Sequence, residues 1–134
     1  MSNIGAGLSR RKILVVEDDP AAARFVVYVL GERGGFDVSH VTDPVVALQR
    51  IADEAWDLVL TNLDLPRMTG LDLLASVRRI APGLPVAITT GRAMSAAHAH
   101  ALRRHADAFL ERPIQPQRLT TVATALIGNR PQPP

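Results

Sequence analysis

An α/β fold with a parallel sheet and helices on both faces is the fold class that this 134-residue sequence predicts. Five short runs that suit strands alternate with five stretches in which apolar residues recur at helical spacing. Regular alternation of this kind is typical of parallel sheets, because each helix connects one strand to the next. The expected strands cover residues 12–16, 36–41, 57–60, 85–88 and 108–110. The expected helices cover residues 20–33, 44–52, 70–80, 94–104 and 119–127.

The expected strands differ in how continuously apolar they are. KILVV at residues 12–16, DLVL at 57–60 and PVAI at 85–88 are almost uninterrupted, which suits strands buried on both faces of a sheet. AFL at 108–110 is a shorter run of the same kind. FDVSHV at 36–41 mixes polar with apolar residues, and it therefore predicts a strand at the edge of the sheet.

The expected helices carry start and stop signals. The Asp-Pro pairs at 19–20 and 43–44 predict two helix starts, because aspartate caps the first turn and proline suits its first position. Gly34 is expected to end the first helix, and Gly128 the last. Pro82 stops the third helix, since proline cannot continue it.

Composition limits the class of protein. The chain has no cysteine, which excludes disulfides and cysteine-based zinc sites. No run is apolar enough for a signal peptide or a membrane span, so we expect a cytoplasmic domain without membrane contact. A net charge of +2 argues against direct binding of nucleic acid. We expect one domain at residues 12–128, a disordered tail at 1–11, and a proline-rich tail or linker start at 129–134.

Polar side chains follow four of the expected strands, at the edge where open parallel sheets bind their ligands. Clustered carboxylate oxygens suit a hard cation such as Mg²⁺. Asp19 is better explained as a helix cap, because Pro20 follows it directly. The polar residues at these strand ends are Glu17, Asp18, Asp19, Asn62, Asp64, Thr89, Thr90 and Arg112.

Residues 11–128 resemble the receiver domain of two-component response regulators, through the segments VVEDDP, DLVLTNLDLPRMTGLDLL, LPVAITTGRA and ADAFLERPI. The resemblance implies a flavodoxin-like fold, with five parallel strands in the order 2-1-3-4-5 and five helices. It also implies a signalling module that is not an enzyme. In that family a histidine kinase passes a phosphoryl group to an aspartate after the third strand, beside an acidic pair that holds Mg²⁺.

Several positions match the family pattern. By this resemblance Glu17 and Asp18 correspond to the acidic pair, and Asp64 to the position whose backbone carbonyl binds the metal. Thr90 corresponds to the switch hydroxyl, and Phe109 to the aromatic switch position. The resemblance therefore implies that most of a phosphorylation site is present.

Two positions depart from the pattern. The phosphoacceptor position holds Asn62, and the lysine position before Pro113 holds Arg112. An amide lacks the anionic oxygen of a nucleophile and removes one charge from the metal site, so any Mg²⁺ binding should be weak. The planar fork of Arg112 can pair bidentately with Glu17 or Asp18, and can fill the pocket without metal or phosphate.

These departures predict a pseudo-receiver that acts in two-component signal transduction by protein–protein interaction and is not phosphorylated. The resemblance places the partner on the surface that runs from residues 94–104 to residues 119–127 and includes Arg103 and Arg104. The expected partner is a histidine kinase, another regulator, an effector or a second copy in a homodimer. One alternative is an ordinary phosphorelay receiver with an inactivating Asp-to-Asn change at position 62. A remote alternative is a small doubly wound nucleotide-binding enzyme, although no glycine-rich loop follows the first strand.

Overall fold

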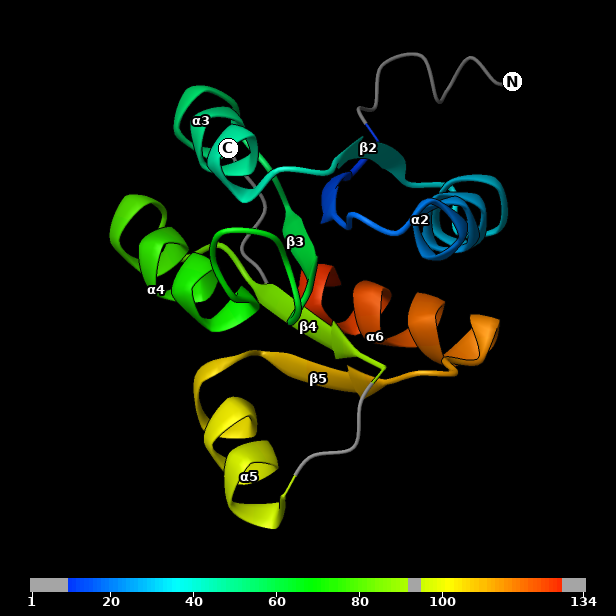
Figure 1. Ribbon diagram of the computed structural model, residues 1–134. Helices are drawn as coiled ribbons and strands as arrows, with labels where there is room; N and C mark the ends of the chain where they lie inside the picture. Colours follow the sequence, from blue (N-terminus) through cyan, green and yellow to red (C-terminus); the bar gives the residue numbers. More distant parts are fainter. Residues whose placement is uncertain (1–9, 92–94, 129–134) are drawn as a thin grey trace, which may run out of the picture.

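The strands pair into one parallel sheet in the order β2-β1-β3-β4-β5, which confirms the expected strand order (Figure 1). This computed structural model describes residues 10–91 and 95–128. The strands are β1 (Lys12–Val16), β2 (Asp37–Val41), β3 (Leu58–Asn62), β4 (Val86–Thr90) and β5 (Ala108–Glu111). The mixed strand β2 lies at an edge, as its sequence predicts.

β3 and β4 end two residues later than the apolar runs predict. Asn62 still pairs in register with Thr89, so the ladder continues through these polar residues. Asn62, Thr89 and Thr90 are all buried. The sequence pattern ends at the last apolar residue, whereas a buried strand accepts polar side chains that find hydrogen-bond partners. Asn62 is therefore held by the sheet itself and not by a loop.

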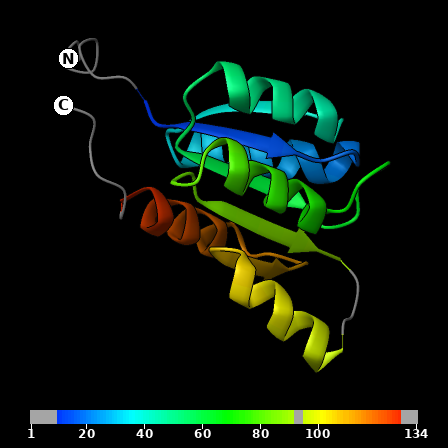
Figure 2. The same cartoon turned by 90° about the vertical axis from the view of Figure 1, so that its left-hand side faces the viewer.

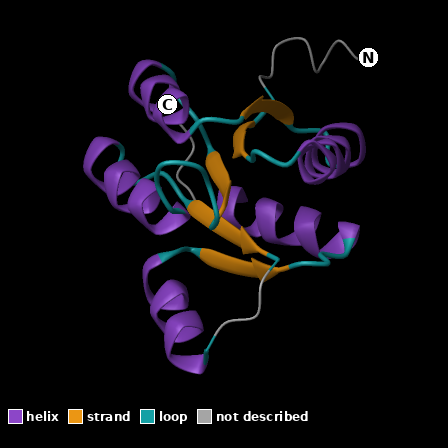
Figure 3. Ribbon diagram, viewed as in Figure 1, coloured by secondary structure: helices purple, strands orange, loops and turns teal. Residues whose placement is uncertain are grey.

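Helices cover both faces of the sheet (Figure 2, Figure 3). One face carries α2 (Pro20–Val27), its π-helical continuation η1 (Tyr28–Arg33) and α6 (Pro116–Gly128); the other carries α3 (Pro44–Asp53), α4 (Gly70–Ile80) and α5 (Ala96–His105). Each face has its own apolar core. Ile13 and Val15 of β1 pack in the core with α2 and α6, whereas Leu14 and Val16 pack in the core with α3, α4 and α5. This alternation follows from the two-residue period of a strand.

The two Asp-Pro starts are confirmed. Asp19 and Asp43 cap α2 and α3, and each side chain accepts a hydrogen bond from a backbone N–H of the first turn. α4 begins with a capping box between Thr69 and Asp72, which the sequence interpretation missed. The expected start of the fourth helix, Met94, lies outside the described residues.

Phe25 on α2 and Ile80 on α4, which helical spacing places with the buried apolar residues, are exposed: 38% of Phe25 and 45% of Ile80 are accessible to solvent. A helix on a sheet buries only one stripe of its surface. On α2 that stripe contains Ala23 and Val26, and on α4 it ends at Val77. Phe25 and Ile80 therefore lie at the margin of the core.

The ends of the chain are described only in part. Arg11 lies within the predicted N-terminal tail, and its guanidinium pairs with the Asp57 carboxylate at 3.1 Å. Residues 1–9 and 129–134 fall outside the described ranges, so the predicted tails stay predictions. Over the described residues, no helix combines the length and the apolar character needed to cross a bilayer.

Candidate functional site

The carboxyl ends of β1, β3, β4 and β5 bring together residues that are far apart in the sequence. Glu17 directly follows β1, Asn62 ends β3, and Arg112 directly follows β5. Because these strands are parallel neighbours, their carboxyl ends meet at one edge of the sheet. This is the edge where the sequence analysis expects a site.

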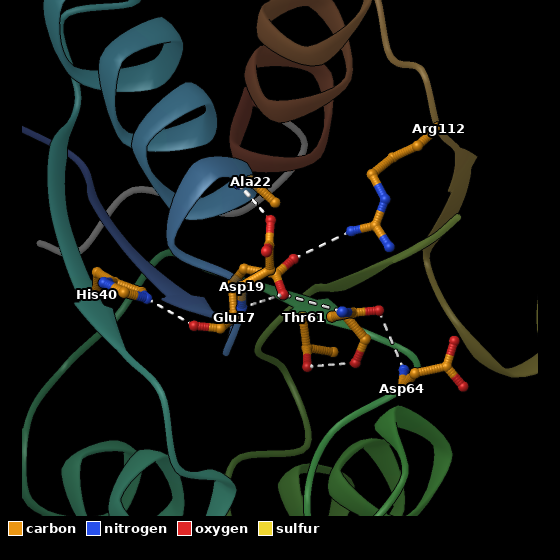
Figure 4. Close-up of polar contacts among 8 residues, drawn as sticks. Glu17, Asp19, Ala22, His40, Thr61, Asp64 and Arg112 are labelled. Carbon is orange, nitrogen blue, oxygen red and sulfur yellow. Dashed lines mark hydrogen bonds and ion pairs between the residues drawn. The ribbon is translucent and has the colours of Figure 1, made fainter. Parts of the chain in front are cut away.

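Glu17 is the centre of the site, and its carboxylate accepts three hydrogen bonds (Figure 4). One oxygen, Oε2, accepts from the side-chain amide of Asn62 at 2.9 Å and from the backbone N–H of Asp19 at 3.1 Å. The other oxygen, Oε1, accepts from Nη1 of Arg112 at 3.1 Å. Only 3% of Glu17 is exposed, so these donors replace the water that a carboxylate otherwise needs.

The amide of Asn62 is oriented by two contacts of opposite kind. Its Oδ1 accepts a hydrogen bond from the backbone N–H of Asp64 at 3.0 Å, while its Nδ2 donates to Glu17. A backbone N–H only donates and an ionised carboxylate only accepts, so this is the one orientation of the amide that satisfies both. An aspartate at this position would keep the first contact and lose the second.

Arg112 pairs with Glu17, one of the two partners that the sequence analysis allows for it. The contact uses a single nitrogen, so the expected bidentate geometry with Glu17 is not present. The backbone N–H of Arg112 also donates to the carbonyl of Thr90 at 2.8 Å, which fixes the end of β5 beside the end of β4. The Arg112 side chain is 31% exposed.

Asp18 and Asp64, the other two expected metal ligands, are exposed. Within residues 10–91 and 95–128, the Asp18 carboxylate has no hydrogen bond or ion pair. Over the same residues, no three His, Cys, Asp or Glu side chains are grouped to hold a metal ion. The assignment of Glu17, Asp18 and the Asp64 carbonyl as metal ligands thus stays a prediction.

The two residues expected at switch positions, Thr90 and Phe109, have different surroundings. Thr90 is completely buried at the end of β4. Phe109 in β5 is half-buried and packs against the core cluster that includes α4 and α5. The guanidinium of Arg103 lies 5.2 Å from the Phe109 ring centroid, and it approaches the carboxylate of Glu111 at 3.7 Å. Arg103 therefore links α5 to β5 on the surface beside Phe109.

Two contacts of the site were missed from the sequence. The ring nitrogen Nε2 of His40, in β2, lies 2.7 Å from the backbone oxygen of Glu17. The Thr61 hydroxyl donates to the backbone oxygen of Asn62 at 3.0 Å. A polar residue near the end of the edge strand is the only signal that the sequence offers for His40.

An ion pair between Asp43 and Arg67 joins two loops at this edge of the sheet. The backbone N–H of Val45 and the Arg67 guanidinium lower the pKa of the Asp43 carboxyl below its ordinary value. Arg67 adopts a φ of 70°, in the left-handed region that disfavours residues with a Cβ. The loop after β3 therefore combines an electrostatic link with backbone strain.

Comparison with known proteins agrees with this geometry. The model of the response regulator receiver domain family matches residues 13–124. The DNA-binding response regulator MtrA of Mycolicibacterium smegmatis is 35% identical over 126 residues, which cover 92% of this chain and 54% of that protein. The chain thus spans about half the length of this curated relative.

Solved structures show the same fold. A CheY-like response regulator receiver domain protein from Methanospirillum hungatei JF-1 matches with a TM-score of 0.80 and 28% identity, over 90% of this chain and 95% of that one. The receiver domain of the sensor histidine kinase PA1611 from Pseudomonas aeruginosa PAO1 has a magnesium ion coordinated in its active site cleft. It matches with a TM-score of 0.81 and 22% identity, over 90% of this chain and all (100%) of that one, and supports the fold alone.

Proposed function

This chain belongs to the response regulator receiver domain family, and we propose that it is a pseudo-receiver: it is not phosphorylated at position 62 and acts by protein–protein contact in two-component signalling. One observation carries the proposal. The side chain at the phosphoacceptor position is an amide that donates a hydrogen bond to Glu17, at 2.9 Å. The position that would carry the nucleophile is instead a hydrogen-bond donor to the acidic pair.

The chemistry of Asn62 supports this proposal. Attack on phosphorus requires an electron pair on an anionic oxygen, and the amide of Asn62 is neutral. Its oxygen already accepts a hydrogen bond from the backbone N–H of Asp64. In our proposal Thr90 and Phe109 occupy the switch positions without a phosphoryl group to respond to, so they keep one arrangement whether or not a phosphodonor is present.

The residues of this pocket are a poor fit for the magnesium ion that one structural neighbour holds. Both oxygens of Glu17 already accept hydrogen bonds, one of them from a guanidinium. Asn62 supplies no negative charge. Of the acidic pair, Glu17 is buried and Asp18 is exposed. Hard cations favour sites with several anionic oxygens. We therefore propose weak Mg²⁺ binding, and no step of the proposed function uses the metal.

The proposed partner surface runs from α5 across β5 to α6. On α5 the residues Arg103 and Arg104 are exposed, which gives this surface a basic character. A basic surface complements an acidic one, so we propose a signalling protein with an acidic docking face: a histidine kinase, another regulator or an effector. A homodimer through the same surface is a second arrangement. The proposal includes a cytoplasmic location, no enzymatic activity and no direct contact with nucleic acid or membrane.

Incubation with acetyl phosphate and Mg²⁺ tests the proposed function. We expect intact-mass spectrometry to detect no hydroxylamine-labile phosphoryl adduct on the unaltered chain. Asn62→Asp restores the acceptor, and Asn62→Asp with Arg112→Lys restores both departing positions. The double variant is the positive control and should be labelled more readily than the single one, because Arg112 occupies the pocket beside Glu17.

Three outcomes would change this picture in different ways. Stoichiometric labelling of the unaltered chain at any aspartate would overturn the proposal. Equal labelling of the single and double variants would remove only the obstructing role of Arg112. Efficient labelling of Asn62→Asp alone would favour the alternative of an ordinary phosphorelay receiver that carries an inactivating change at position 62.

A further inference from the structure

Gly91 lies directly against the guanidinium of Arg112. A Cβ placed on Gly91 would come within 2.9 Å of Nη2, 3.1 Å of Nε and 3.4 Å of Cζ of Arg112. The backbone of Gly91 is not in the left-handed region, so its conformation does not itself require glycine. The feature that excludes a side chain at position 91 is the guanidinium.

Building on the proposed function, in which the pocket works without a metal ion, we propose that Gly91 is a positioning residue for Arg112. Because Gly91 has no Cβ, the guanidinium of Arg112 can lie beside it. In this position the guanidinium acts as an internal cation and prevents divalent metal ions from binding to Glu17. In this proposal Gly91 acts through Arg112: it determines whether Glu17 is paired with the guanidinium or is open to a metal ion.

The backbone geometry supports this role. The backbone N–H of Arg112 donates to the carbonyl of Thr90 at 2.8 Å, so the chain that leads into Gly91 is fixed beside Arg112. From there Nη1 reaches Oε1 of Glu17 at 3.1 Å, near the upper limit of a good N–H···O hydrogen bond. A shift of a few tenths of an ångström away from position 91 is enough to lengthen or misalign this contact.

The charge balance of the pocket gives the consequence. Among the described residues, Arg112 is the only charged partner of Glu17; the other two donors, from Asn62 and Asp19, are neutral. The Glu17 side chain is 4% exposed, so an uncompensated charge there would be costly. If Arg112 is displaced, a divalent cation becomes the natural replacement, with Asp18 as the neighbouring carboxylate.

Gly91→Ala is the direct test. The atoms that the new Cβ would meet belong to the end of a flexible side chain and not to the backbone, so Arg112 should move while the fold is kept. We expect Mn²⁺, followed by paramagnetic broadening of NMR signals at residues 17–19 and 62–64, to bind at least about tenfold more tightly than to the unaltered chain. That factor corresponds to the lower end of the contribution of a hydrogen bond to a charged group.

Two further variants sharpen the test. Gly83→Ala is the matched control, because Gly83 is exposed and a Cβ there meets nothing within 4 Å; its Mn²⁺ affinity should equal that of the unaltered chain. Arg112→Ala should raise the affinity at least as much as Gly91→Ala. The double variant Gly91→Ala with Arg112→Ala should match Arg112→Ala alone, since Gly91 acts only through Arg112.

Unchanged Mn²⁺ affinity in folded Gly91→Ala would overturn the positioning role of Gly91. Additive effects in the double variant would overturn it as well. Unchanged affinity in Arg112→Ala would overturn the role of the guanidinium as an internal cation, whether or not Gly91→Ala folds. None of these results changes the labelling expected for the unaltered chain, and labelling of the unaltered chain would overturn the proposed function without changing the metal titrations.

Discussion

Asn62→Asp should destabilise this protein, although it restores the acidic residue that the family uses. The Nδ2 of Asn62 lies 2.9 Å from Oε2 of Glu17, so the substitution replaces a donor with a second carboxylate oxygen at the same place. Losing a hydrogen bond to a charged group costs about 1.5–3 kcal/mol. The cost rises further because the two carboxylates then repel each other.

The repulsion can be bounded from the same distance. Two unit charges 2.9 Å apart repel by about 6 kcal/mol at an effective dielectric constant of about 20. Small movements of the two side chains and the attraction of Arg112 offset much of this value. We expect a net loss of about 2–4 kcal/mol in the free energy of unfolding at neutral pH without divalent cations, within the range of disrupted buried networks.

Urea denaturation with and without excess Mg²⁺ measures this loss. Mg²⁺ should restore part of the stability of Asn62→Asp, because a bound cation stabilises only the folded state, and it should change the unaltered chain little. Asn62→Ala is the uncharged comparison: it loses the hydrogen bond to Glu17 and also the one from the Asp64 N–H, but it adds no charge. It should therefore not respond to Mg²⁺.

Either of two results would refute this reasoning. Asn62→Asp as stable as the unaltered chain in the absence of divalent cations would mean that the contact between Asn62 and Glu17 contributes nothing. Equal stability of Asn62→Asp and Asn62→Ala, with no response of either to Mg²⁺, would mean that the two carboxylates do not face each other.

Two further predictions concern the loops beside the site. Arg67→Gly and Arg67→Ala both lose the ion pair with Asp43, but glycine accepts the φ of 70° without strain. Thermal denaturation should therefore show Arg67→Gly to be more stable than Arg67→Ala by about 1 kcal/mol. Equal stability of the two variants would contradict the left-handed backbone at position 67. Because the pKa of Asp43 is lowered in the folded state, its stabilising contribution is present above its unfolded pKa of about 3.9 and is lost as pH falls through the folded value. Asn also caps helices well, so Asp43→Asn should keep the helix cap and lose only the titrating group. Measured by urea denaturation, its free energy of unfolding should fall less between about pH 5 and 2 than that of the unaltered chain. Parallel curves of stability against pH would exclude this linkage.

Much of the fold was predictable because its signals are local. Hydrophobic runs and Asp-Pro starts depend on neighbouring residues, and they predicted all five strands and the capped starts of α2 and α3. The ends of β3 and β4 were wrong by two residues, since Asn62 and Thr90 are polar and yet belong to the ladder. The strand order came from the family resemblance and is confirmed.

The contacts of the site were less predictable than its members. The resemblance identified Glu17, Asn62 and Arg112, but their pairing spans 45 residues in one case and 95 in the other. Which oxygen each donor uses, and that Arg112 offers one nitrogen instead of two, depend on distances that only the folded chain sets. The contact of Gly91 with Arg112 has no sequence signal, because glycine usually indicates a turn.

Because Asn62 and Arg112 bind different oxygens of the same carboxylate, we expect the effects of substitutions at these two positions on stability to be coupled. A single change to aspartate at position 62 sets two carboxylates face to face, whereas Arg112→Lys keeps a positive charge at its position. We therefore expect a lineage that gains aspartate at position 62 to pass through a less stable protein. This cost favours retention of the asparagine, even without selection on signalling itself.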